Sequence, residues 1–113
     1  MRLTSEFFVS ATIRRCFGEG GNAVVQRRGA QEAGAIFIVV DYLDGTADLI
    51  GPAPQSAFGM DRPTERLFQR ILERVPPAEI TARLSREDRF DPDYWVLAIE
   101  DRDGRSFVDL APS

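Results

Sequence analysis

Two aspartates on either side of a predicted β-turn are the first residues that suggest chemistry. Asp41 and Asp48 flank Asp44-Gly45, a dipeptide typical of two-residue hairpin loops. With such a loop Asp41 pairs directly with Asp48, and the like charges require an arginine or a hard cation such as Mg²⁺ or Ca²⁺. A three-residue loop with a glycine bulge instead places Asp41 opposite Ala47. Both registers remain open, and no metal is assigned.

Four arginines form the second group: Arg14, Arg15, Arg27 and Arg28. Guanidinium groups bind carboxylate or phosphate through paired hydrogen bonds, so these residues form a candidate anion or ligand site. However, Arg27 and Arg28 are neighbours on a predicted strand and point to opposite faces. The competing interpretation is solvated arginines paired with Glu6, Glu19 or Glu32.

Phe7 is the preferred interaction residue. It lies near Ala11 and Arg14, on the side of the first predicted helix that is opposite the apolar stripe. The stripe, which is expected to be buried, consists of Phe8, Val9, Thr12, Ile13, Cys16 and Phe17. Either the sheet covers both sides of this helix, or Phe7 contacts another chain.

The connector 89–95 mixes aromatic and acidic residues. Phe90, Asp91, Asp93 and Trp95 form a second candidate interaction surface, suited to a basic peptide or a partner helix. In the alternative interpretation, Phe90 and Trp95 fill the core of the protein.

The composition excludes most standard catalytic groups. The 113 residues include no histidine, and the 14 basic residues are all arginine. Imidazole bases, Ser-His-Asp triads and Schiff-base lysines are therefore absent. The single cysteine, Cys16, excludes an intrachain disulfide and a Cys/His zinc site, and it is expected in the core. No catalytic residue, cofactor or resident metal is predicted.

The charge distribution argues against a nucleic-acid partner. The net charge is −4, and the excess of acids lies after residue 90. An interface through Arg66, Arg70 and Arg74 ranks last, because Glu65 and Glu73 lie among these arginines. No apolar run is long enough to span a membrane, and no export signal is found. The expected location is the cytoplasm.

Residue periodicity and turn residues predict the elements that position these groups. Helices are expected over 6–17, 63–75 and 78–88, and strands over 23–28, 35–40, 46–50, 94–100 and 106–110. The 35–40 run is apolar on both faces, which is typical of a central strand. The expected fold is a single α+β domain over 1–113, with order α-β-β-β-α-α-β-β and a mostly antiparallel sheet of four to five strands.

Four blocks of residues, which together cover nearly the whole chain, resemble a known family. The blocks are 3–10 with Arg14-Arg15, then 27–29 with 33–35, then 44–46 with Leu49 and 51–55, and finally 89–93 with Trp95-Val96 and 99–102. Their order is similar to that of the small alphaproteobacterial proteins of domain-of-unknown-function family 1491. This resemblance implies a bacterial cytoplasmic protein and assigns no activity, ligand or residue role.

Two function hypotheses follow. The favoured one is a non-enzymatic cytoplasmic protein-interaction domain that associates with itself or with another protein. The alternative is a small-molecule or anion-binding enzyme that uses the carboxylates of Asp41 and Asp48 together with arginines.

Overall fold

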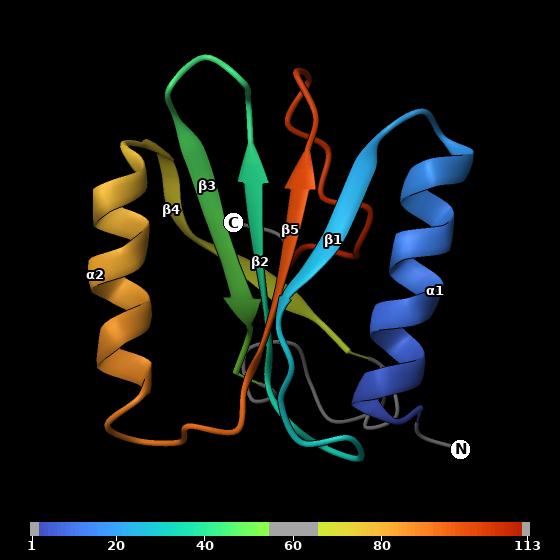
Figure 1. Cartoon of the computed structure of the whole chain (residues 1–113), viewed down its shortest axis with the longest axis vertical. Coiled ribbons are helices and arrows are strands. Elements are labelled where there is room, and N and C mark those ends of the chain that lie inside the picture. The colour runs from blue at the N-terminus through green and yellow to red at the C-terminus, as the bar shows by residue number, and fades with distance from the viewer. Residues whose placement is uncertain (1–2, 55–65, 112–113) are drawn as a thin grey trace.

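The computed structural model describes residues 3–54 and 66–111 and contains a five-stranded mixed sheet with two helices in that part of the chain (Figure 1). In chain order the elements are α1 (Ser5–Gly18), β1 (Asn22–Arg27), β2 (Ile36–Asp41), β3 (Ala47–Pro52), β4 (Phe68–Val75), α2 (Pro77–Glu87) and β5 (Trp95–Glu100). The strand order is β1-β5-β2-β3-β4. The expected α+β class is confirmed.

The sheet has an apolar cluster on each face. Ile36, Ile38 and Val40 of β2 belong to the cluster that includes Val9 and Cys16 of α1, and we call this side the α1 face. Phe37 of β2 packs with Ile80 of α2 on the other side, the α2 face. In Figure 1 α1 lies beside β1, and α2 lies beside β3 and β4. The prediction of a central strand is confirmed: the side chains of β2 are buried on the α1 face, and on the α2 face Phe37 is buried and Val39 half-buried.

Local sequence explains both helices. The Thr4 hydroxyl caps α1 by accepting a hydrogen bond from the Phe7 amide at 3.1 Å. Gly20 follows the helix with a φ of +88°. Pro77 occupies the first turn of α2, where its missing N–H costs nothing. The predictions of helices over 6–17 and 78–88 are therefore confirmed to within a residue at each end.

The prediction of a helix over 63–75 is wrong. Residues 63–65 lie outside the described residues, and Phe68–Val75 forms the edge strand β4. The β3–β4 ladder shifts register twice: Leu72 pairs with Leu49, but the next pair joins Arg70 to Ile50, which leaves Ile71 as an extra residue. These two bulges convert the period-two pattern of a strand into spacings of three and four, which mimic a helix.

Two further predictions need correction. The sheet is less antiparallel than expected, because β5 inserts between β1 and β2 and runs parallel to β2. The predicted strand 106–110 is a coil that makes only an isolated bridge between Leu110 and Phe68.

Neither helix within 3–54 and 66–111 is long and apolar enough to cross a membrane.

Candidate functional site

The β2–β3 hairpin adopts the second of the two registers left open by the sequence. Its loop has three residues, 43–45, and the Tyr42 amide donates to the Thr46 carbonyl at 3.1 Å. Asp41 pairs with Ala47, and Val40 pairs with Asp48. The two aspartates therefore point to opposite faces of the sheet, and the facing carboxylate pair does not form.

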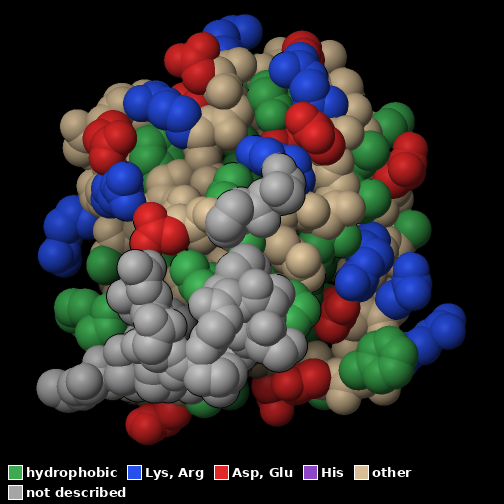
Figure 2. Space-filling model, turned by 180° about the vertical axis from the view of Figure 1, so that it is seen from behind, with side chains coloured by type: hydrophobic (Ala, Val, Ile, Leu, Met, Phe, Trp, Pro, Cys, Tyr) green, Lys and Arg blue, Asp and Glu red, His purple; other side chains and the backbone are tan. Residues whose placement is uncertain are grey.

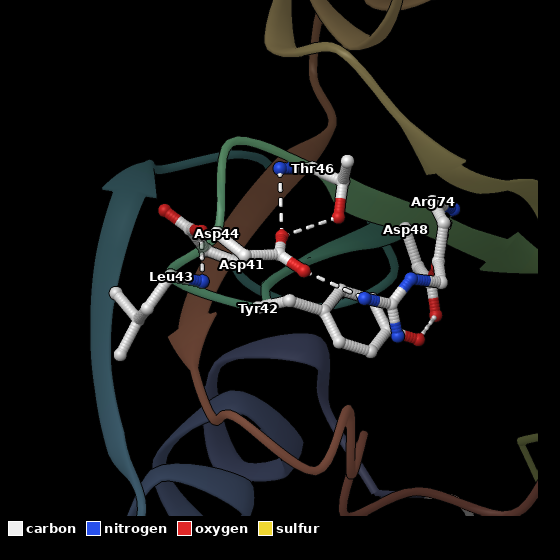
Figure 3. Close-up of polar contacts among 7 residues, drawn as sticks. All are labelled: Asp41, Tyr42, Leu43, Asp44, Thr46, Asp48 and Arg74. Carbon is white, nitrogen blue, oxygen red and sulfur yellow. Dashed lines mark hydrogen bonds and ion pairs between the residues drawn. The ribbon is translucent and has the colours of Figure 1, made fainter.

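Asp48 is nevertheless the centre of a polar network beneath the hairpin (Figure 3). Its side chain is fully buried on the α1 face. Its Oδ2 accepts from the Tyr42 hydroxyl at 2.7 Å and from Arg70 Nε at 3.1 Å, and its Oδ1 accepts from the Arg74 amide at 2.8 Å. These three bonds replace the hydration that the carboxylate loses on burial.

The network fixes the edge of the sheet to the hairpin loop. Arg74 adopts a φ of +50° at one bulge of β4, a conformation that the bond from its amide to Asp48 stabilises. Its guanidinium lies 4.1 Å from the Tyr42 ring centre and contacts Asp44 Oδ2 at 2.6 Å. Burial and the hydrogen bond to Asp48 raise the pKa of Tyr42.

These contacts assign Asp48 a structural role. Both of its oxygens already accept hydrogen bonds, and Asp44 is engaged by Thr46 and Arg74. Within 3–54 and 66–111 no group of three or more acidic or cysteine side chains lies close enough to hold a metal ion. The hydrogen bonds from Arg70 and Arg74 to Asp48 hold the bulged edge strand β4 against β3. None of the contacts of Asp48 presents an activated nucleophile or base.

The four arginines of the predicted anion site do not converge. Arg28 pairs with Glu6 at 2.7 Å near the start of α1, whereas Arg15 pairs with Glu19 at 3.0 Å near its end. Those positions are separated by most of a 14-residue helix, about 20 Å. Arg27 pairs with Asp88, whereas Arg14 is exposed and forms no ion pair with the described residues. Acidic and basic side chains also alternate over the face in Figure 2.

Phe7 lies on an uncovered side of α1. Its side chain is 57 % exposed, so the sheet does not wrap around this helix. Beside it a groove of about 370 Å³ opens between α1 and β1, and Val9, Val25 and Trp95 contribute apolar lining. Phe17 is also exposed, at 55 %, although its spacing placed it on the buried half of the helix.

The connector after α2 divides between surface and core. Phe90 is 82 % exposed, with Asp91 and Asp93 exposed beside it. Trp95 is 1 % exposed, and its indole Nε1 donates to the Ala30 carbonyl at 2.8 Å. Trp95 is therefore a core residue, as the alternative interpretation of this connector expected, whereas Phe90 is exposed and does not fill the core.

Sequence reasoning missed a second buried carboxylate, Asp101. It accepts from the Arg105 amide at 2.7 Å and from its guanidinium at 2.8 and 3.1 Å, which closes the turn after β5 and lowers the pKa of Asp101. The spacing of four residues between Asp101 and Arg105 is the sequence signal that could have indicated this pair.

The prediction that Cys16 is a core residue is confirmed, and burial raises the pKa of its thiol.

Comparisons with known proteins identify relatives along the whole chain. The family model described as "Protein of unknown function (DUF1491)" matches residues 3–109, which confirms the resemblance found in the sequence. The solution structure of protein Atu0922 from A. tumefaciens is 47 % identical with a TM-score of 0.87, over 100 % of this chain and 98 % of that one. A crystal structure of a DUF1491 family protein from Caulobacter crescentus is 36 % identical with a TM-score of 0.78, over 99 % and 100 %. No curated protein matches the chain.

Proposed function

We propose that this chain, which belongs to the DUF1491 family of proteins of unknown function, is a non-enzymatic protein-interaction domain that self-associates through the outer face of α1. One observation carries the proposal. Leu3, just before the helix, and the exposed helical residues Phe7 and Phe17 are 45 %, 57 % and 55 % exposed. Within the helix, Phe7, Ser10, Arg14 and Phe17 follow spacings of 3, 4 and 3, the pattern of a helix-pairing seam.

The seam suits an antiparallel pair of α1 helices. In a register centred near Thr12, Phe7 of one copy packs against Phe17 of the second copy at both ends. The small side chain of Ser10 then lies opposite the Arg14 stem. No carboxylate belongs to the seam, and antiparallel helices align their dipoles favourably. The same surface is thus complementary to itself, which a two-fold dimer requires.

The expected dimer is weak. A 14-residue helix is about 21 Å long, so a single helix pair buries less surface than a standard interface of roughly 1,600 Å². We therefore expect a dissociation constant on the order of 10 to 100 μM, which corresponds to roughly −7 to −5.5 kcal/mol.

Sedimentation equilibrium of the full chain at 10–500 μM tests the proposal. The wild type is expected to show reversible dimerisation, and the double variant Phe7→Ala/Phe17→Ala is expected to remain monomeric. The matched control is Phe90→Ala, which removes an even more exposed phenylalanine away from the seam and should leave the dimer unchanged. A wild type that is monomeric at 500 μM contradicts the proposal, as does a double variant that still dimerises.

A further inference from the structure

Among residues 3–54 and 66–111, no helix lies over one half of the α2 face of the sheet. α2 contacts β3 and β4, whereas β2, β5 and β1 extend beyond it. Three strands span about 14 Å, and a helix with its side chains is about 10 Å wide. The uncovered part of this face therefore has room for a second helix beside α2 (Figure 1).

An apolar row crosses this uncovered face. Val24, Ala98 and Val39 pair in register across β1, β5 and β2, and the row continues to Leu49 beside α2. Leu49 is fully buried, Ala98 and Val39 are half-buried, and Val24 is 62 % exposed. The row thus becomes more exposed with distance from α2. Next to it, a groove of about 230 Å³ separates Thr81 and Ser85 of α2 from Gln26 of β1.

The next row towards the hairpin is acidic. Asp41 and Glu100 are register neighbours on the parallel strands β2 and β5, on the same face as the apolar row. Among the described residues, the Asp41 carboxylate accepts only from the Leu43 amide at 2.8 Å and the Glu100 carboxylate only from Asn22 Nδ2 at 3.2 Å, and neither forms an ion pair with an arginine. Two adjacent like charges on one face destabilise a sheet unless a cation lies between them.

From this juxtaposition we infer that the surface formed by Val24, Val39, Ala98, Asp41 and Glu100 is a docking site for a basic amphipathic helix of another protein. The apolar side of that helix covers Val24, Ala98 and Val39, and an arginine or lysine on its flank lies between Asp41 and Glu100. A second copy of this chain is a poor occupant, because the same face on both copies would bring four carboxylates together. This site is separate from the α1 seam and does not depend on self-association.

The test measures the binding of three designed 18-residue peptides to the full chain by fluorescence anisotropy. One peptide is an amphipathic helix with a leucine stripe flanked by arginines. The second has the same residues in scrambled order, and the third replaces every arginine with glutamate. The amphipathic basic peptide should bind at least tenfold more tightly than the other two. Equal binding of the scrambled peptide would reduce the interaction to non-specific charge attraction and overturn the inference.

Variants locate the site on the molecule. Asp41→Asn/Glu100→Gln retains the oxygens that accept from Leu43 and Asn22, so the fold should persist while affinity for the basic peptide falls about tenfold. The control Asp91→Asn/Asp93→Asn makes the same charge change in the exposed connector and should leave affinity unchanged. Peptide-induced NMR shifts should centre on Val24, Val39 and Ala98. The proposed site is refuted if both double variants lose the same affinity for the basic peptide. It is also refuted if the peptide-induced NMR shifts are confined to another surface. The variant Phe7→Ala/Phe17→Ala should bind the peptide with the affinity of the wild type. Loss of peptide binding and loss of dimerisation are therefore independent results, and each tests its own proposal.

Discussion

Replacing Asp48 with alanine is the perturbation whose cost follows most directly from the structure. The fully buried carboxylate accepts three hydrogen bonds, at 2.7, 2.8 and 3.1 Å. Its removal leaves the Tyr42 hydroxyl and the Arg74 amide without an acceptor and Arg70 without its counter-ion. Hydrogen bonds to charged groups contribute about 1.5–3 kcal/mol each, but they are not additive, and Arg70 is one-third exposed. We therefore expect Asp48→Ala to lower the free energy of unfolding by about 3–5 kcal/mol.

Urea denaturation followed by far-ultraviolet circular dichroism measures this cost. A domain of this size has a free energy of unfolding of roughly 5–15 kcal/mol, so the variant should fold with a much lower midpoint and an unchanged slope. The matched control is Asp44→Ala in the same hairpin, whose carboxylate is exposed and pairs with Arg74. The control should cost much less, because exposed ion pairs contribute little. A loss below about 1 kcal/mol for Asp48→Ala, or an equal loss in both variants, would refute the assignment of Asp48 as the anchor of the edge strand.

Two further perturbations test other parts of the fold. Hydrogen bonds from Arg105 lower the pKa of Asp101, so this carboxylate stabilises the fold above about pH 4, and that stabilisation is lost as the pH falls through its folded-state pKa. Stability measured between pH 7 and 2 should therefore decline less steeply below pH 4 in Asp101→Asn, and identical slopes would contradict the assignment. Gly20 and Gly104 both have positive φ, but an added Cβ meets open space at Gly20 and the Tyr42 ring at Gly104. Gly104→Ala should hence lower the free energy of unfolding by about 1–3 kcal/mol more than Gly20→Ala does in urea denaturation. Equal losses of stability in the two variants would contradict a steric role of the Tyr42 ring at Gly104.

The sequence predicted the elements whose periodicity is regular. The apolar run of β2 identified the central strand, and the helices predicted over 6–17 and 78–88 match α1 and α2 to within a residue at each end. It failed at β4, because two bulges give this edge strand the spacing of a helix and because pairing with β3 is a long-range interaction that propensity does not report. The insertion of β5 between β1 and β2 is likewise determined by long-range strand pairing, which the local sequence does not indicate.

The candidate sites were predictable only in part. The sequence singled out Asp48 but not its partners Tyr42, Arg70 and Arg74, because the partners depend on the hairpin register and on the bulge of β4. Phe7 was correctly placed on the outer side of α1, but Phe17 was placed with the buried stripe. Phe17 lies near the end of the helix, where periodicity alone does not say how far the core extends.

Disulfide trapping of α1 against α1 tests the central claim most directly. Phe7→Cys and Phe17→Cys chains are prepared separately and mixed, while the native Cys16 stays buried. In the proposed antiparallel register the two new thiols meet in one layer, and the opposite layer keeps both phenylalanines. The mixture should form a covalent dimer on mild oxidation, whereas Phe7→Cys alone should not, because its two thiols lie about 15 Å apart along the helices. A mixture that stays monomeric, or a Phe7→Cys chain that cross-links to itself as readily as the mixture, would contradict self-association through this seam.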